Sequence, residues 1–282
     1  MRGDRGSRIL GSLAGGGDPR RSVAIALAST AVFFAAIGFL IVRSSGWPEV
    51  KRAFFDRDQF TSSLPEIASA FLTNVKIFLI AEGVILVLAL AIAVVRSLPG
   101  PVFFPLRMLA IAYADFFRGV PTILVIYILG FGAPALGLSG VPTSTIFWGI
   151  VSLVLVYSAY VSEVYRAGID SVHPSQEAAA RSLGLSRGQA LRHVILPQAV
   201  RRVMPPLLND FIGLQKDSAL VALLGTVEAF RQSQINVAAT FNYTPYVATA
   251  LLFVALTIPL ARLTDWLVAR DRRRQQAGRT TG

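Results

Sequence analysis

The stretch VAIALASTAVFFAAIGFLIV, residues 23–42, decides the class of fold. Its 20 residues carry no charge, and Ser29 and Thr30 supply its only hydroxyl groups. A helix needs about 20 apolar residues to cross the hydrocarbon core of a bilayer. A signal peptide has a shorter apolar region and a small-residue cleavage site, which residues 43–48 do not offer. We therefore expect an uncleaved membrane-spanning helix here.

Five further apolar stretches follow the first. They cover approximately residues 67–95, 106–129, 146–165, 206–224 and 246–269. The chain of 282 residues is 54% hydrophobic and 15% charged, whereas a soluble domain has about 45–50% apolar and about 25% charged residues. The sequence predicts an all-α, polytopic membrane protein with six transmembrane helices, which are a five-helix core and one extra N-terminal helix.

The basic residues predict the orientation. The net charge is +11, and 18 of the 27 Lys and Arg residues fall in the two tails and in the segments after the second and fourth stretches. Five lie on the opposite side and four lie inside the spans. Because Lys and Arg accumulate in cytoplasmic loops, we expect both termini in the cytoplasm, with no nucleic-acid partner.

The division of the chain follows from these spans. We expect basic cytoplasmic tails at residues 1–21 and 271–282, both without fixed structure. An extra N-terminal helix and an external loop occupy residues 22–60. The core occupies residues 61–270 and includes a cytoplasmic loop at residues 167–198.

Composition excludes several kinds of site. The chain has no cysteine and two histidines, His173 and His193, which rules out disulfide scaffolds, thiol nucleophiles and Cys/His zinc sites. We expect no metal and no cofactor. The phosphate-binding pattern G-x-x-x-x-G-K-[ST] is also absent from the sequence, so the chain is not expected to hydrolyse ATP.

The loop at residues 167–198 is too long and too regularly patterned for a plain connection. We expect Ser175 to cap a short helix over residues 176–183, with Gly184 ending it in the left-handed conformation. Ser186 and Gln189 form a capping-box pattern that starts a second helix, with Pro197 near its end. These helices either enter a groove of a partner protein or lie on the lipid surface and brace the bundle. The residues available to a partner are apolar: Ala178, Ala179, Leu183 and Leu185.

Four sequence motifs carry a resemblance to a known family. Ala178-Ala179-Ala180 and Gly184, followed after nine intervening residues by Val194-Ile195-Leu196-Pro197, resemble the E-A-A loop of ATP-binding-cassette (ABC) importer permeases. Three other motifs resemble the polar amino-acid uptake branch of that family: FFRGVPT at 116–122, SAYVSEVYRAGI at 158–169 and LQKDSAL at 214–220. Together the motifs cover about residues 64–270. One departure is that Ala178 stands where the family has glutamate, and the nearest carboxylate, on Glu177, is rotated by about 100° on the helix.

The resemblance implies a type I importer permease, the binding-protein-dependent inner-membrane component that moves polar or charged amino acids. Its expected partners are two cytoplasmic ATPase subunits, a second permease subunit (as a homo- or heterodimer), and an extracellular or periplasmic binding protein. ATP-driven closure of the ATPase pair would turn the permease pair from inward-facing to outward-facing. The residues implied in ATPase coupling are Glu177, Ala178, Ala179, Gly184, Leu185, Leu196 and Pro197.

Charges at the depth of the spans are costly and are therefore candidates for function. Three pairs are spaced i,i+3, which allows ion pairing on a helix: Asp115 with Arg118, Glu163 with Arg166, and Arg262 with Asp265. We interpret them as neutralised structural pairs or interfacial anchors. Lys76 and Glu82 do not face each other on a helix, so each needs another partner.

The fifth apolar stretch differs from the other five because its polar residues recur at a spacing of seven. Asn209 and Lys216 share one helix face, and Asp210 and Asp217 share the neighbouring face, which favours a water-lined path. Asp210 could bind the ammonium group of an amino acid, and Asn209 could donate to its carboxylate. Lys216 and Asp217 could instead neutralise each other in structure or gating. Ser218 completes the candidate pathway.

Other functional classes remain open at this point. A permease for another small polar solute would share these features. A secondary transporter or channel would need no ATPase, but such proteins often have inverted repeats and paired broken helices, and the sequence indicates neither. A membrane anchor or sensor subunit does not need the charges of the fifth stretch. The particular solute does not follow from the sequence.

Overall fold

The computed structural model describes residues 19–98 and 100–277, and these residues form helices and connecting turns with no strand. Residues 1–18 and 278–282 of the two predicted tails lie outside the described residues. Residues 271–277 form the end of helix α13 (Thr244–Ala277), so the prediction that the C-terminal tail has no fixed structure was wrong for this part. The contacts divide the chain into two compact units, residues up to Asp56 and residues from Arg57 onward. The smaller unit contains α2 (Pro19–Val42) and α3 (Trp47–Phe54).

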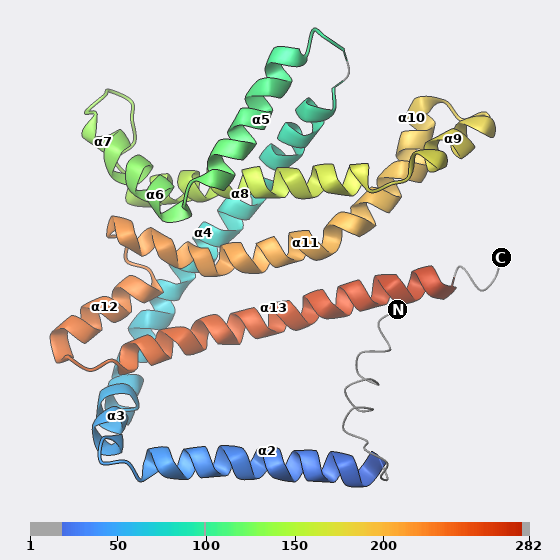
Figure 1. The fold of residues 1–282 in the computed structure, drawn as a ribbon. Helices are drawn as coiled ribbons and strands as arrows, with labels where there is room; N and C mark the ends of the chain where they lie inside the picture. Colours follow the sequence, from blue (N-terminus) through green and yellow to red (C-terminus); the bar gives the residue numbers. More distant parts are fainter. Residues whose placement is uncertain (1–18, 99, 278–282) are drawn as a thin grey trace. The chain divides into compact units, whose positions relative to one another are not determined.

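The larger unit contains the remaining helices (Figure 1). Its long helices are α4 (Arg57–Ser97), α5 (Phe104–Gly119), α8 (Thr145–Asp170), α11 (Leu196–Asp217) and α13 (Thr244–Ala277). Shorter helices connect them: α6 (Thr122–Tyr127), α7 (Ala133–Ala135), α9 (Pro174–Ser182), α10 (Arg187–Ala190) and α12 (Ala229–Thr240). Two π-helical segments, η1 (Ile128–Gly132) and η2 (Leu191–Ile195), and one 3₁₀ segment, η3 (Ser218–Leu224), complete the unit.

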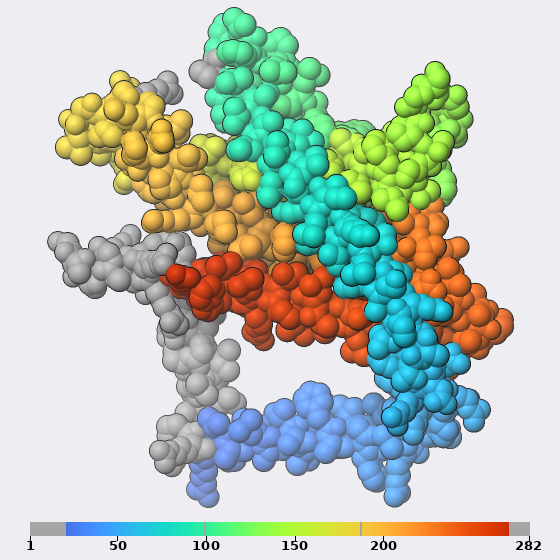
Figure 2. All heavy atoms as spheres, turned by 180° about the vertical axis from the view of Figure 1, so that it is seen from behind, coloured from blue at the N-terminus to red at the C-terminus, as the bar shows by residue number. Residues whose placement is uncertain are grey.

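The core of this unit forms where α4 crosses α8. Figure 2 shows α4 running diagonally across the unit, next to α11 and α13. Small and branched side chains, such as those of Ala81, Ile85 and Ala89 on α4, are fully buried here and pack in one cluster with Leu153 and Val161 of α8. Small residues let helix backbones approach closely, which is how helices associate in membranes.

The third apolar stretch, predicted as one continuous span, is broken into α5 and α6. The two halves meet at an angle of 104°. The break lies at Val120 and Pro121, where Val120 is extended with φ −92° and ψ 131°. Proline lacks an N–H group and disfavours the α conformation in the residue before it, so the helix ends there. The prediction of one continuous span over residues 106–129 was therefore wrong at this position.

Pro197 does not end the second loop helix as the sequence suggested. It lies in the first turn of α11, and α10, η2 and α11 follow one another without a gap. The π-helical turns at residues 191–195 directly precede it. A wider turn relieves the clash between the proline ring and the preceding helix carbonyls, so the helix continues.

The described residues include four helical segments that are long and apolar enough to cross a membrane, or up to five if the bent α5–α6 pair counts as one span. The four are Arg21–Val42, a stretch within Trp47–Ser97, Thr145–Asp170 and Thr244–Arg270. The predicted fifth stretch, residues 206–224, is divided between α11 and η3 and does not meet that criterion because of its charges. The exact count of six is thus not confirmed.

The close packing of α8 on α11 predicts the effect of one substitution. A Cβ atom at Gly168 would overlap Val203 Cγ1, so Gly168→Ala should destabilise the protein by about 1–3 kcal/mol through overpacking. The melting temperature in detergent should fall and should recover partly in Gly168→Ala/Val203→Ala. Gly83→Ala is the control, since nothing lies within 4 Å of that position. Equal melting temperatures for both single variants would contradict the packing.

Candidate functional site

The first loop helix, α9, ends as predicted but begins differently. The Gly184 N–H donates to the Arg181 carbonyl (3.0 Å) and the Leu185 N–H donates to the Ala180 carbonyl (3.2 Å). With φ +87° at Gly184, this is a Schellman motif. The N-cap is His173 rather than Ser175, because His173 Nδ1 accepts from the Ser175 N–H at 3.2 Å. Ser175 already lies inside the first turn.

The second loop helix begins as the capping box predicts. The Ser186 N–H donates to Gln189 Oε1 (2.9 Å), and the Gln189 N–H donates to Ser186 Oγ (3.3 Å). Two orphan donors at the helix start are thereby satisfied. Gln198 Nε2 donates to Gln176 Oε1 at 3.4 Å, which ties α9 to the beginning of α11.

The predicted coupling residues are largely on the surface. Of the predicted coupling residues, Leu196 is 49% exposed. Leu183, which is one of the apolar residues available to a partner, is 83% exposed. The other coupling residues that are exposed are Ala178, Ala179, Gly184 and Pro197, and those that are half-buried are Glu177 and Leu185. Ala180 is 5% exposed and faces the inside of the loop. The loop therefore has an exposed apolar side chain, that of Leu183, at the turn between its two helices.

The polar residues of α11 occupy different environments. Asn209 and Lys216 are exposed, whereas Asp210 is half-buried and its Oδ2 atom is inaccessible to solvent and has no hydrogen-bond partner among the described residues. Asp217 Oδ2 accepts from the Tyr157 hydroxyl at 2.8 Å. No ion pair joins Lys216 to Asp217 in the part of the chain that the structure describes. Ser218 is buried.

Further polar groups from α4 and α8 face this part of α11. The Glu82 carboxylate on α4 interacts electrostatically with Asp210 and with the Tyr165 hydroxyl of α8. The Tyr157 hydroxyl also interacts with Asp210. The sequence shows Glu82 as a span charge that needs a partner, but it does not show that the partner region is itself acidic. Two carboxylates and two tyrosine hydroxyls on three helices are therefore within electrostatic range of one another.

A second charged group surrounds Glu163. Its carboxylate binds Arg96 of α4, Arg118 of α5 (3.7 Å) and Arg166 of its own helix (2.8 Å). The predicted Glu163–Arg166 pair is present, but Arg118 pairs with Glu163 instead of Asp115. The predicted Arg262–Asp265 pair is present at 3.9 Å, with both side chains largely exposed. Glu163 therefore joins three helices in one ionic cluster.

A third polar group is buried and was missed by sequence reasoning. Asn74 of α4 donates to Glu228 Oε2 (2.7 Å) and Ser218 Oγ (3.2 Å), and its Oδ1 accepts from the Ala229 N–H (3.0 Å). Glu228 caps α12 by accepting from the Arg231 N–H at 2.7 Å. Burial raises the pKa of the Glu228 carboxyl above its ordinary value, although these hydrogen bonds act in the opposite direction. The network fastens α4, η3 and α12 together.

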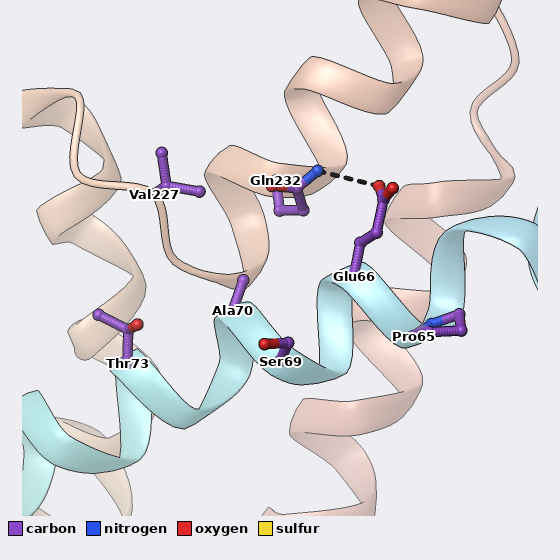
Figure 3. A pocket seen from close by; sticks show the side chains of 7 residues that line it. All are labelled: Pro65, Glu66, Ser69, Ala70, Thr73, Val227 and Gln232. Atoms are coloured by element: carbon purple, nitrogen blue, oxygen red, sulfur yellow. Dashed lines mark hydrogen bonds between the residues drawn. The ribbon is translucent and has the colours of Figure 1, made fainter.

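An open hollow of about 710 Å³ lies beside this network. Figure 3 shows Glu66 at its edge, and Gln232 Nε2 donates to Glu66 Oε2 at 3.2 Å. Asn236 Nδ2 donates to the same oxygen at 3.2 Å. The lining residues come from α4, from the segment that leads into α12 and from α12 itself: Pro65, Glu66, Ser69, Ala70, Thr73, Val227 and Gln232.

Removing the Asn74 side chain tests the buried network. Asn74→Ala removes the side-chain donor to Glu228 Oε2 and the acceptor of the Ala229 N–H, and each unsatisfied buried group costs about 1–3 kcal/mol. We expect a clearly lower melting temperature in detergent. Asn236→Ala is the matched control, because that amide binds the exposed Glu66 carboxylate. If both variants melt like the unmodified chain, the network does not hold these elements together.

Comparison with known proteins identifies the family to which this chain is similar. The family described as "Binding-protein-dependent transport system inner membrane component" matches residues 97–273. The "Probable glutamine ABC transporter permease protein GlnM" of Bacillus subtilis (strain 168) is 37% identical over 185 residues, which are 65% of this chain and 83% of that protein. The "Arginine transport system permease protein ArtQ" of the same organism is 31% identical over 205 residues, which are 71% and 91% of the two chains.

Solved structures show the same fold. The structure described as an "amino acid ABC transporter with histidines" matches with a TM-score of 0.70 at 30% identity, and the match covers 76% of this chain and 98% of the other. The MetNI methionine ABC transporter matches with a TM-score of 0.57 at 18% identity, covering 71% of this chain and 93% of the other, and supports the fold alone. The described residues thus adopt the all-helical type I ABC importer permease fold. The chain belongs to the family of binding-protein-dependent transport system inner membrane components, the membrane permeases of ABC importers.

Proposed function

We propose that this chain is the permease of an ABC importer that carries polar or charged amino acids into a bacterial cell. The observation that carries the proposal is the likeness to GlnM and ArtQ, which are permeases for glutamine and arginine by name. The chain is a transport component, and ATP hydrolysis takes place in a partner ATPase. The acidic group around Asp210 supports a substrate with an ammonium or other cationic group.

The family implies an ATPase, a binding protein and a second permease as partners, within the cell membrane. We propose in addition two ATPase subunits per complex, with both termini and the loop at residues 167–198 on the cytoplasmic side. The asymmetry of the basic residues supports this orientation. The core would then begin near residue 61, after the extra N-terminal helix and the external loop. The two basic tails would flank the whole membrane-embedded part of the chain. The second permease is another copy of this chain or a related one.

The turn between α9 and α10 is our proposed contact with the ATPase. Leu183 projects from it with 83% of its surface exposed, beside the exposed Ala178 and Ala179. An exposed leucine at the tip of a fixed turn is suited to a hydrophobic pocket, and burial of a leucine contributes about 1.5–3 kcal/mol. The Schellman motif fixes the direction of this side chain.

Substitution of Leu183 tests this contact. Leu183→Glu should lower the amount of co-expressed ATPase that copurifies with the tagged chain in mild detergent by about tenfold or more, since 1.4 kcal/mol corresponds to a factor of ten. Its own melting temperature should stay unchanged, because the side chain is exposed. Leu138→Glu, at a 59% exposed position in another loop, is the control. Undiminished copurification of the ATPase with Leu183→Glu would exclude the contact.

The acidic residues at the α4–α8–α11 crossing are our proposed part of the substrate path. Glu82 and Asp210 repel each other, and Asp210 Oδ2 lacks a hydrogen-bond partner among the described residues. A cationic group between two carboxylates removes this repulsion and satisfies the unpaired oxygen. Asn209 and Lys216 can face the carboxylate of the amino acid, whereas Asp217 and Ser218 already have partners in Tyr157 and Asn74.

Asp210→Asn tests the role of this carboxylate. Uptake driven by ATP into vesicles that contain permease, ATPase and binding protein should fall by at least about tenfold, which corresponds to the loss of one charge-assisted hydrogen bond of about 1.5–3 kcal/mol. Asp265→Asn, an exposed carboxylate of α13, should transport normally. Normal uptake together with a normal substrate-dependent ATPase response in Asp210→Asn would exclude the role.

The remaining alternative is distinguished by the same preparations. A permease for another small polar solute would bind ATPase through the loop and fail to carry amino acids.

A further inference from the structure

The short helix α3 follows α2 after a tight corner. Only residues 43–46 separate the two helices. The corner is fixed by backbone hydrogen bonds from the Ser44 N–H to the Ile41 carbonyl and from the Trp47 N–H to the Ser44 carbonyl, both 3.1 Å. The Ser44 hydroxyl also donates to the Ile41 carbonyl at 2.7 Å. In Figure 1 the chain turns here, and α3 runs across the direction of α2.

The sequence of α3 is amphipathic. Trp47, Val50 and Phe54 are spaced i, i+3 and i+7, so they share one face of the helix. Glu49 and Arg52 lie on the opposite face and form an exposed ion pair at 3.9 Å. No residue of α3 is buried, and Val50 and Phe54 are each 41% exposed. Transfer of an apolar face of this kind out of water is favourable.

The position of α3 relative to α2 indicates what covers this face. The apolar segment of α2, Arg21–Val42, has 22 residues and is about 33 Å long at 1.5 Å per residue. This length is close to the thickness of the hydrocarbon core. A helix that turns sideways at the end of such a span lies at the level of the lipid head groups. Trp at this level is typical of the membrane interface. Arg43, whose guanidinium lies 4.8 Å from the Phe39 ring centroid, marks the end of the apolar segment.

We propose that α3 lies flat in the membrane surface, with Trp47, Val50 and Phe54 in the boundary between head groups and acyl chains. Its partner is the lipid surface, and its function is to fix the depth and rotation of α2. Glu49 and Arg52 then face water, and Lys51, at the edge between the two faces, extends its stem along the lipid and its ammonium to the head groups. The matched family region begins at residue 97, and α3 precedes it.

Site-directed spin labelling of the full-length chain tests the proposal directly. Because the sequence contains no cysteine, each single-cysteine variant carries one label. The label is placed at Val50 and Phe54 on the apolar face and at Glu49 and Arg52 on the polar face. The chain is reconstituted in vesicles of phosphatidylethanolamine and phosphatidylglycerol, and collision rates with oxygen and with a water-soluble nickel chelate are measured.

Oxygen concentrates in lipid, whereas the nickel chelate stays in water. We expect the ratio of oxygen to nickel collisions to be several-fold higher for Val50→Cys and Phe54→Cys than for Glu49→Cys and Arg52→Cys. Val32→Cys, 68% exposed in the middle of α2, is the lipid reference. Leu183→Cys, 83% exposed on the loop turn, is the water reference.

Three results would overturn the proposal. High nickel collisions at all four positions would place α3 in water. Low collisions with both reagents at Val50 and Phe54 would show that protein, rather than lipid, covers the apolar face. A nickel-accessible label at Val32 would show that α2, from which α3 extends, does not cross the membrane. None of these measurements requires ATPase, binding protein or substrate, so failure of the proposed transport function would leave the result unaffected.

Discussion

The crossing of α4 over α8 is the contact from which the rest of the larger unit is built. Ala81 and Ala89 of α4 are fully buried there, and their small side chains let the two helices approach closely. α11 packs against α8 at Gly168. α5 contacts α8 through the Tyr113 hydroxyl, which is hydrogen-bonded to Ser158 Oγ at 2.7 Å. Larger residues at the crossing would separate α4 from α8 and would remove the frame that holds both α5 and α11.

Charges near this frame fall into two kinds, and the difference between them indicates function. Glu163 is surrounded by arginines from three helices, so its charge is compensated within the protein. Asp210 lies beside another carboxylate, that of Glu82, and one of its oxygens has no partner among the described residues. A compensated charge is satisfied without a ligand, whereas an uncompensated pair of carboxylates is stabilised by a cation. The second kind is the one for which we propose a role in binding.

The sequence was informative wherever a structural feature depends on neighbours along the chain. The apolar run at residues 23–42 predicted a span, and Gly184 predicted a left-handed helix end, because both follow from a few adjacent residues. It failed where distant residues meet. Arg118 pairs with Glu163 rather than with Asp115, because α8 brings a better-placed carboxylate. The Asn74 network likewise depends on residues about 150 positions away, and spacing along the chain carries no signal for it.

The failure at Pro197 has a consequence for how the proposed ATPase contact reaches the proposed substrate path. Had the helix ended there, motion of the loop could reach residues 210–217 only through side-chain contacts. Instead α10, η2 and α11 continue from Arg187 to Asp217, roughly 46 Å at 1.5 Å per residue. A continuous helical backbone therefore connects the proposed ATPase contact with Asp210, although Pro205 and Pro206 inside α11 each remove one backbone donor between them. The π-helical turns beside Pro197 are what keep that connection unbroken.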